Sequence, residues 1–422
     1  MSAAPSAASR RAWLIFALLC LAYGISYFHR IMTSTISVDM MNDFQIGPET
    51  LGFASSATML GYAFSQIPAG ILADTVGTRK TLAVFQLAGG ILCLAFGLSS
   101  NWTCVVISRF LLGFVLAANV PGLKVLAMWF PPSMYSKVSG LLISSAIIGK
   151  LLMGYPLVFL ASLWTWRGAT VFFGLVTFAL GICSWLLIRD TPPDAWQPRA
   201  GSTAKKMTLR EAAKIVLRMK NYWFILLWFV LIVAVQFALM TMWWGSYFLQ
   251  GCGMTKMQLS AIFTVMAFAT LPVIPLFAVL SDNVFHSRKN VLILGSVIIT
   301  AGLLWFALKT EQPGFTELLL VSTIINTGIG ASCPLCFTMV KESVPQACMA
   351  SSFGLLNSGA PVLTSVINVA FGFILSKGLG LGLAPFAAYG KAFFTLAAVS
   401  TAALLICLPM KDTYRAPSAS QN

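Results

Sequence analysis

Two basic residues interrupt the first long apolar stretch of the chain. The segment ISYFHRIMTS places His29 and Arg30 side by side near the end of this stretch. An Arg at the centre of a membrane helix costs roughly 2.5–3.5 kcal/mol on insertion scales, which favours a functional reason for its presence. Helical spacing puts Tyr23, Tyr27, Arg30 and Ser34 on one face. Because a guanidinium can bind a carboxylate or phosphate through paired hydrogen bonds, this face indicates anion binding.

A second basic group lies deep in another apolar segment. Lys150 falls about twelve residues into the fifth segment, near its middle at a rise of 1.5 Å per residue. The N-terminal half has no acidic residue at comparable depth. An anionic substrate would therefore supply the countercharge for Arg30 and Lys150. Lys124 lies nearer the cytoplasmic end of the fourth segment, where snorkelling or structure of the cytoplasmic mouth is as consistent with its position as substrate contact. Lys124 is also a candidate coupling residue.

His29 is the only histidine inside a predicted helix. A histidine with its ordinary pKa of about 6.5 can exchange protons at physiological pH, so His29 is a candidate for proton coupling as well as substrate binding. A packed histidine is the alternative. Because acidic residues are so scarce in the apolar segments, anion exchange and uniport also stay open.

Other polar or amphipathic side chains inside apolar runs are weaker candidates for the wall of a binding cavity. An aromatic residue in a membrane helix more often packs than binds a ligand. An amide in such a helix is a better candidate for ligand binding than an aromatic residue is. These candidates are Tyr62, Gln66, Gln236, Trp243, Trp244, Asn326 and Asn357.

Composition assigns the chain to a broad class. Of 422 residues, 58% are hydrophobic and 9% are charged, whereas soluble domains have roughly 25% charged residues. About 20 apolar residues suffice for a helix to span a bilayer. The many continuous runs of this kind predict an all-α, multi-pass membrane protein, and their lack of alternation argues against a membrane β-barrel.

We expect twelve transmembrane helices in two six-helix halves. Their predicted ranges are 13–36, 51–73, 80–99, 103–128, 138–160, 168–188, 222–249, 258–281, 290–309, 316–340, 348–376 and 388–409. The predicted domains are a cytoplasmic tail at 1–12, bundles at 13–188 and 222–410, a linker at 189–221 and a cytoplasmic tail at 411–422. Within the linker, KKMTLREAAKIVLRMK resembles a basic amphipathic helix at the membrane surface.

The distribution of charge predicts the orientation. Eighteen of the 27 basic residues fall on the side of the N-terminus, five fall on the opposite side and four lie inside the predicted helices. This bias places both termini and the linker in the cytoplasm. It also explains the net charge of +15 without nucleic-acid binding. The pair Arg10-Arg11 resembles a twin-arginine signal, but no cleavage site follows, so we expect an uncleaved first helix.

The two halves repeat a loop motif. IPAGILADTVGTRK follows the second predicted helix, and IPLFAVLSDNVFHSRK follows the eighth. Repeated six-helix halves are typical of transporters, whose substrate site lies between the repeats near the membrane midplane.

The first of these loops resembles the signature loop of the major facilitator superfamily, G-x-L-x-D-R-x-G-R-[RK]. The matching positions are Gly70, Asp74, Gly77, Arg79 and Lys80, with departures at Thr75 and Thr78. RFLLG, from Arg109 to Gly113, is similar to the helix 4 signature, and Asp282 with Arg288 is a degenerate second loop. The resemblance implies two pseudo-symmetric six-helix bundles. It also implies a cytoplasmic latch in which Asp74 pairs with a helix N-terminus of the other half and with Arg79 or Lys80, while Gly77 permits a tight turn and Gly70 a close helix approach.

Further stretches resemble the organic-anion branch of the superfamily, which includes anion:cation symporters and organophosphate antiporters. These stretches are YFHR, GYAFSQIPAGILAD, LKVLAMWFPP, TWRGATVFFG and KESVP with SSFGLLNSG. The resemblance implies that Arg30 holds the substrate. The chain departs from the symporters at His29, where they usually carry Asp, and at Phe114–Asn119, where they often carry Glu.

We therefore expect a monomeric secondary transporter in the bacterial inner membrane that takes up a small organic anion by alternating access, with protons as the coupling ion. An anion exchanger and a transport-like anion sensor are the alternatives. Multidrug efflux of cations would call for buried acids instead. The sequence has no GxxxxGK[ST], HExxH or HxxxD motif, so neither ATP hydrolysis nor an enzyme is expected, and we expect no cofactor or metal. Cys333 and Cys336 form a CxxC inside an apolar run, which does not favour a redox role.

Overall fold

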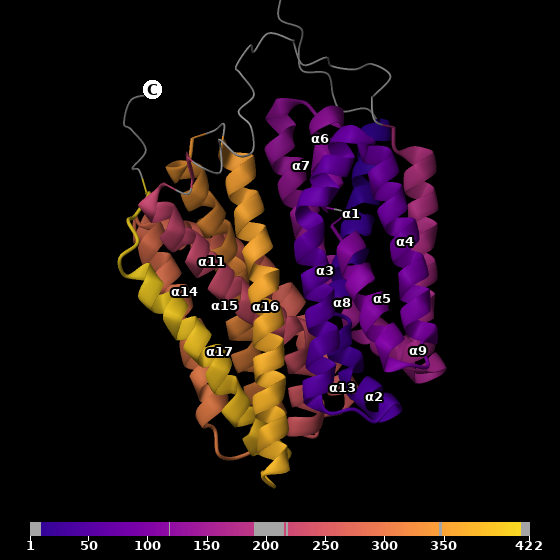
Figure 1. Ribbon diagram of the computed structural model, residues 1–422. Coiled ribbons are helices and arrows are strands. Elements are labelled where there is room, and N and C mark those ends of the chain that lie inside the picture. The colour runs from indigo at the N-terminus through magenta and orange to yellow at the C-terminus, as the bar shows by residue number, and fades with distance from the viewer. Residues whose placement is uncertain (1–9, 118, 190–214, 217, 346–347, 415–422) are drawn as a thin grey trace, which may run out of the picture. The chain divides into compact units, whose positions relative to one another are not determined.

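The computed structural model describes residues 10–117, 119–189, 215–216, 218–345 and 348–414. The chain divides into two compact units. Unit 1 is Met1–Ile46 with Phe53–Ala204, and unit 2 is Gly47–Gly52 with Lys205–Asn422. Every regular element among the described residues is a helix, as expected (Figure 1). Most of the predicted linker, 190–214 and 217, lies outside the described residues, as do 1–9 and 415–422 of the predicted tails.

The N-terminal half has nine helical elements in the described residues, coloured indigo to magenta in Figure 1. They are α1 (Arg10–Ile31), α2 (Thr33–Phe44), α3 (Pro48–Thr75), α4 (Thr78–Leu98), α5 (Trp102–Val115), α6 (Asn119–Trp129), α7 (Pro132–Ser144), α8 (Ala146–Met153) and α9 (Tyr155–Leu187).

Several predicted single helices are broken into two or three of these elements. Pro121 explains the break between α5 and α6, because proline has no N–H to donate to Ala117, four residues earlier; the Val120 amide instead donates to Ala117 O at 3.2 Å. Pro156, at the start of α9, has the same effect after α8. Within α9 the backbone leaves the helical region at Trp164 and Thr165, which separates the predicted helices 138–160 and 168–188.

The C-terminal half has ten described helical elements, coloured pink to yellow in Figure 1. They are α11 (Lys220–Ala238), η1 (Leu239–Trp243), α12 (Trp244–Ser246), η2 (Tyr247–Gly251), α13 (Lys256–Val279), η3 (Leu280–Val284), α14 (Arg288–Leu308), α15 (Phe315–Ser343), α16 (Met349–Gly380) and α17 (Pro385–Cys407). The elements η1, η2 and η3 are π-helical turns, which are frequent at functional positions of longer helices.

Ten helical spans among the described residues are long and apolar enough to cross a membrane. The predicted helices 138–160 and 168–188 fall within a single one of these spans, Lys137–Leu187, which contains the kink at Trp164 and Thr165. The predicted helix 51–73 corresponds to α3, which is not among the ten. The structure therefore supports an all-helical, multi-pass architecture, whereas the count of twelve spans stays a prediction.

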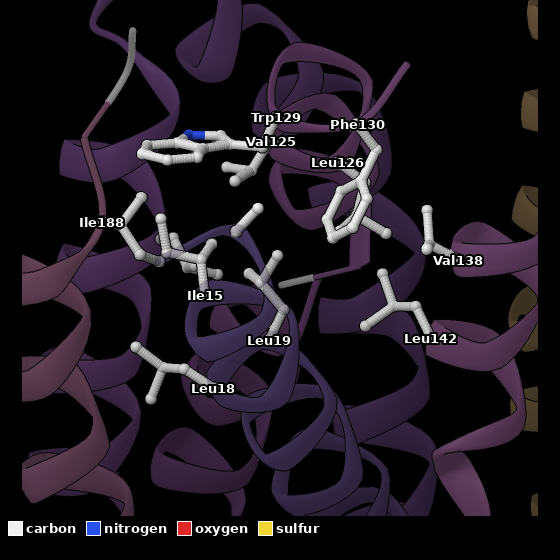
Figure 2. Close-up of a cluster of buried hydrophobic side chains, with 12 residues drawn as sticks. Ile15, Leu18, Leu19, Val125, Leu126, Trp129, Phe130, Val138, Leu142 and Ile188 are labelled. Atoms are coloured by element: carbon white, nitrogen blue, oxygen red, sulfur yellow. The ribbon is translucent and has the colours of Figure 1, made fainter. Parts of the chain in front are cut away.

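A buried cluster joins α1, α6, α7 and the end of α9 within unit 1. Figure 2 shows Ile15 and Leu19 of α1 facing Val125, Leu126 and other apolar side chains of the cluster. Trp129 lies at one edge of this cluster, and its Nε1 donates to Arg189 O at 3.0 Å. The indole thus satisfies its polar atom while its ring packs, as buried Trp side chains usually do.

Helices α3 and α5 meet backbone to backbone. A Cβ placed on Gly61 would lie 2.0 Å from Phe110 O, and one on Gly113 would lie 2.1 Å from Thr58 O. Small residues permit such contacts between membrane helices. The glycine of the RFLLG motif is therefore a packing position that sets how close Arg109, four residues earlier, lies to its neighbours.

We predict that Gly113→Ala destabilises the protein by about 1–3 kcal/mol, because the added methyl overpacks a contact between two backbones. The measurement is thermal denaturation of the detergent-solubilised protein. Gly140→Ala is the matched control, since a Cβ at Gly140 would meet nothing within 4 Å. Equal melting temperatures for the two variants would contradict the prediction.

Candidate functional site

Arg30 is buried inside a cage of tyrosine rings in unit 1. Its side chain is 2% exposed. The guanidinium carbon lies 4.5 Å from the ring centroid of Tyr62 on α3, 4.8 Å from that of Tyr27 and 5.7 Å from that of Tyr23. Cation–π contacts of this kind stabilise a guanidinium that has lost its water. The structure thus brings together three predicted site residues, Arg30, Tyr27 and Tyr62.

The hydrogen bonding of Arg30 is incomplete. Nε donates to Ser26 O at 3.4 Å, one turn back in α1, whereas Nη2 is buried with no hydrogen-bond partner in the described part of the chain. The Tyr23 hydroxyl is a further hydrogen-bond partner of the Arg30 side chain, whereas the ring faces attract the charge but do not accept the in-plane N–H groups as an oxygen does. Because buried polar groups are nearly always paired, this N–H marks a position suited to an acceptor from outside the protein.

Lys150 lies on α8, which packs tightly on α1. Its side chain is 8% exposed. A Cβ on the neighbouring Gly149 would lie 2.5 Å from Gly24 O and 2.6 Å from Phe28 N. This contact between backbones places α8 directly against the part of α1 that carries Tyr27. Lys150 is therefore a second buried base in the same helix pair as Arg30, as the sequence predicts.

Arg109, on α5, forms hydrogen bonds on both sides of the break in the first predicted helix. The side chain is fully buried. Nη1 donates to His29 O at 3.1 Å and Nη2 donates to Thr33 Oγ1 at 2.6 Å. Met32, between α1 and α2, separates these two acceptors. Because carbonyls in the last turn of a helix lack intrahelical partners, Arg109 can satisfy one of them and tie α5 to the junction of α1 and α2.

His29 points to a different set of neighbours from Arg30. It is fully buried, and Nε2 lies 2.7 Å from Thr177 Oγ1 on α9. Nδ1 lies 3.7 Å from Cys93 Sγ on α4. The adjacent Phe28 ring lies 4.2 Å from the ring of Phe173, also on α9. His29 and Arg30, although successive in α1, thus contact different neighbouring helices: His29 contacts α4 and α9, and Arg30 contacts α3.

The signature loop has a partner that the sequence did not identify as one. Asp74 forms an ion pair with Lys124 at 2.7 Å, and Lys124 Nζ also donates to Ala73 O at 2.7 Å. Arg79, one of the two expected partners, donates from Nε to Trp185 O at 2.7 Å. Lys124 therefore connects α6 to the end of α3, and its separation of 50 residues from Asp74 explains why spacing alone did not reveal the pair.

The two loop glycines have different roles. Gly77 has a φ of 103°, a conformation that glycine adopts readily and other residues rarely do, as the expected tight turn requires. A Cβ at Gly70 would meet only Val120 Cγ1, at 3.8 Å. This is an ordinary contact, so within the described residues the close helix approach expected at Gly70 occurs instead at Gly61 and Gly113.

The second copy of the loop is part of a larger polar network in unit 2. Arg288 forms ion pairs with Asp282 and, at 3.4 Å, with Glu342 at the end of α15. Asp412 accepts hydrogen bonds from Ser287 Oγ and from the Arg288 amide at 3.1 Å. Burial raises the pKa of Asp412, but these hydrogen bonds outweigh it, so that the pKa lies below its ordinary value.

The segment after α17 completes this network. Tyr414 donates from its hydroxyl to Asp282 O at 3.2 Å, and its ring lies 5.3 Å from the Arg288 guanidinium. Thr413 Oγ1 donates to Glu342 at 2.6 Å. Sequence reasoning identified Asp282 and Arg288 but not Glu342 or these C-terminal groups, because their positions follow from how distant helices end.

Two unit 2 candidates make buried side-chain contacts. Trp243 donates from Nε1 to Asn368 Oδ1 at 3.1 Å and stacks on Phe371 with ring centroids 4.2 Å apart. Asn326 donates to Met266 O and Thr270 Oγ1, both at 3.2 Å. Its Oδ1 is buried without a hydrogen-bond partner in the described residues, which makes Asn326 the amide candidate with an unused acceptor.

Of the remaining candidates, two amides bond to their own helices. Asn357 donates to Phe353 O at 3.0 Å, and Gln66 donates to Tyr62 O at 3.3 Å. Gln236 on α11 is buried, and Trp244 packs in a cluster of rings with Phe248.

No group of three or more His, Cys, Asp or Glu side chains with metal-binding geometry occurs among the described residues.

A polar cleft of about 390 Å³ lies at the end of α2, lined by Asp39, Asn42, Asp43, Thr165, Trp166 and Arg167. Asp43 accepts from Arg167 Nε at 2.8 Å and from Trp166 Nε1 at 3.2 Å. Sequence reasoning missed this cluster because the first predicted helix ends at 36, whereas α2 continues to Phe44.

Comparison with known proteins decides the family. A model of the Major Facilitator Superfamily matches residues 19–367. The chain belongs to this superfamily. It is therefore an integral, multi-pass membrane transporter and not an enzyme, as the loop motifs and helix pattern predicted.

Several relatives of this superfamily member are named as transporters of organic acids. The chain is 22% identical over 385 residues to a "Probable sulfoacetate transporter" of Cupriavidus necator, covering 86% of this chain and 87% of the relative. It is 21% identical over 401 residues to a "Probable galactarate/D-glucarate transporter" of Escherichia coli, covering 86% and 88%. A crystal structure of a bacterial homologue of the human lysosomal transporter Spinster shares the fold, with a TM-score of 0.80, 14% identity and coverage of 95% of this chain and 97% of that one.

We predict that Arg109→Lys lowers the maximal transport rate at least tenfold and lowers the melting temperature. A lysine is a single point donor that cannot bridge His29 O and Thr33 Oγ1 as a planar guanidinium does. Uptake by proteoliposomes and thermal denaturation are the measurements. Arg11→Lys is the control, because Arg11 lies near the surface, where it makes a 3.4 Å hydrogen bond to Leu187 O and lies 5.9 Å from the Trp129 ring centroid. Normal transport by Arg109→Lys would show that the bridge is dispensable.

Proposed function

We propose that this superfamily member is a secondary transporter that takes up a small organic anion by alternating access, with Arg30 as its principal anion-binding group. The observation that carries this proposal is the buried Arg30 guanidinium, enclosed by tyrosine rings, with Nη2 left without a hydrogen-bond partner among the described residues. A carboxylate or sulfonate oxygen would satisfy that N–H and the charge together.

The distribution of buried charge supports the sign of the substrate. Arg30, Arg109 and Lys150 are buried in unit 1, whereas no Asp or Glu is buried among the residues that the structure describes. Buried charges are costly inside a low-dielectric protein. An anionic substrate lowers this cost on binding, whereas a cationic drug would raise it, which favours organic anion transport over multidrug efflux.

The named relatives support the class of substrate. Sulfoacetate and galactarate or glucarate, which appear in the names of two relatives, are small molecules with two acidic groups each. Arg30 and Lys150 would bind such a molecule through its acidic ends, with Tyr27, Tyr62 and Gln66 on the wall. In the C-terminal half, the proposed candidates for substrate contact are Asn326, whose Oδ1 has no hydrogen-bond partner among the described residues, and, more weakly, Gln236, Trp243 and Asn357.

The proposed topology has twelve membrane-spanning helices in two six-helix bundles, at 13–188 and 222–410. The charge bias supports cytoplasmic termini and a cytoplasmic linker at 189–221, and the proposed location is the bacterial inner membrane, with the protein as a monomer. The loop at Asp74 and its second copy at Asp282 and Arg288 are proposed to bias the two access states, with the Lys124 ion pair as part of the first loop.

An energy source is needed because of the membrane potential. Moving one negative charge into a cell with an inside-negative potential costs about 2.3 kcal/mol per 100 mV. Cotransport of protons offsets this cost, and proton-coupled uptake is the form that we propose. Exchange for an internal anion is the second candidate, because it also cancels the charge movement. A transport-like sensor would bind the anion without accumulating it.

We predict that glucarate or sulfoacetate raises the melting temperature of the purified protein and that Arg30→Lys abolishes the increase. Lysine keeps the charge but loses the planar fork that can reach the substrate from inside the tyrosine cage. Arg79→Lys is the matched control, because Arg79 also lies over an aromatic ring, that of Trp185, but in the first turn of α4. An equal response of both variants would refute the assignment of Arg30.

We predict that proteoliposomes accumulate the same anion when the outside is acidified and that a protonophore removes the accumulation. Symport predicts this result because proton entry drives anion entry. If accumulation instead needs anion preloaded inside and ignores the pH gradient, the protein is an exchanger. Binding without accumulation under either condition would identify a sensor.

A further inference from the structure

We infer that His29 is a positioning residue that orients the Arg30 face of α1, and that it does not carry the transported proton. This inference rests on the proposed role of Arg30 in anion binding. It is carried by the hydrogen bond from His29 to Thr177 on α9, together with the contacts that enclose the imidazole.

The hydrogen bonds define where the imidazole proton lies. Thr177 Oγ1 donates its only hydrogen to Phe173 O at 2.8 Å. With that hydrogen on Phe173 O, the Thr177 oxygen accepts from His29 Nε2, 2.7 Å away. A neutral imidazole with its proton on Nε2 has an unprotonated Nδ1. His29 can thus satisfy Thr177 fully without taking up a second proton.

A second proton on the imidazole, at Nδ1, would find no good hydrogen-bond acceptor among the described residues. Nδ1 faces Cys93 Sγ at 3.7 Å, and this thiol lies 3.4 Å from Thr170 O, to which it can donate. Sulfur is a weak acceptor, so Nδ1–H would gain a poor bond. Arg109 adds a fixed positive charge that bonds to the carbonyl of His29 itself. Among the described residues these contacts include no carboxylate, so a charged imidazole would be buried beside a cation.

The imidazole is also enclosed. His29 is fully buried, with the Phe28 ring 5.3 Å from its own ring and Phe173 packed on Phe28. Its polar contacts lie on α4 and α9, whereas the ring nearest the Arg30 guanidinium belongs to Tyr62 on α3. The contacts of His29 and those of Arg30 therefore lie on different neighbouring helices.

The consequence for Arg30 follows from helical geometry. Adjacent residues of a helix are about 100° apart around its axis, so fixing one side chain fixes the direction of the next. The bond from His29 to α9 sets the rotation of α1 from one side, and Arg109 holds the His29 carbonyl from α5. Together these bonds direct Arg30 toward Tyr62 and keep its guanidinium at the position where an anion would bind.

The test uses matched pairs at both ends of the hydrogen bond. Thr177→Val removes the acceptor and Thr177→Ser keeps it, while His29→Leu removes the donor and His29→Gln retains an N–H near the Nε2 position. Uptake of glucarate and sulfoacetate by proteoliposomes is measured from about pH 5.5 to about pH 8, a range that brackets the ordinary histidine pKa of about 6.5. Thermal-shift titration of each full-length variant gives the apparent affinity for the two probes.

We expect Thr177→Val and His29→Leu to raise the apparent KM about tenfold while the maximal rate changes less than about threefold, because a misdirected Arg30 weakens binding. Thr177→Ser and His29→Gln should restore the KM to within about threefold of the parent. The pH profile of His29→Gln should match that of the parent. A purely structural defect would lower the amount of folded protein but would not produce this split between KM and rate.

Several outcomes would overturn the inference. A flattened pH profile in His29→Gln with an unchanged KM in Thr177→Val would identify His29 as a proton carrier. If Arg30→Lys loses binding but Thr177→Val and His29→Leu bind like the parent, the positioning role alone is wrong. If Arg30→Lys binds both probes like the parent, the proposed site is wrong. A parent protein that responds to neither probe would overturn the inference together with the function on which it rests.

Discussion

The burial of positive charge without buried acids is the constraint on which the N-terminal unit depends. Arg30 and Arg109 are both buried, and no Asp or Glu is buried among the described residues. The protein stabilises the two guanidinium groups differently. Arg109 receives a carbonyl and a hydroxyl from the junction of α1 and α2, whereas Arg30 receives ring faces and keeps an unbonded N–H. Both terminal nitrogens of Arg109 are thus bonded within the protein, although its Nε has no hydrogen-bond partner among the described residues, whereas Nη2 of Arg30 has none and is the group that we propose an anion binds.

Close packing of helix backbones makes this difference in bonding possible. Gly113 brings α5 against α3, and Gly149 brings α8 against α1. Contacts of this kind leave little room for the helices to rotate. Arg109 lies on α5 with Gly113, and Lys150 lies on α8 with Gly149. The close contact at each glycine therefore also fixes the position of the buried base on the same helix. The breaks at Met32 and Pro121 then free backbone groups inside the unit, and Arg109 uses one of them.

The two copies of the loop motif are stabilised by different partners. In the first copy Asp74 pairs with Lys124, which comes from α6. In the second copy Asp282 pairs with Arg288, six residues later, and Arg288 also reaches Glu342. The segment after α17 adds Asp412 and Tyr414 to the second network. A repeated sequence motif thus preserves the position of its acid, while the basic partner shown for it comes from the distant helix α6 in the first copy and from the start of the next helix, α14, in the second.

The sequence by itself determined the fold class and the family and made Arg30 the leading candidate for anion binding, because hydropathy, motif spacing and helical periodicity are local properties of the chain. It placed Tyr27 on the face of Arg30 by spacing alone, but Tyr62 entered only as an aromatic on another helix. Tertiary structure decided that Tyr62 covers the guanidinium, that Lys124 pairs with Asp74 and that Thr177 accepts from His29. The last two pairs are separated by 50 and 148 residues. Such contacts depend on how helices pack and where they break, which no local pattern encodes.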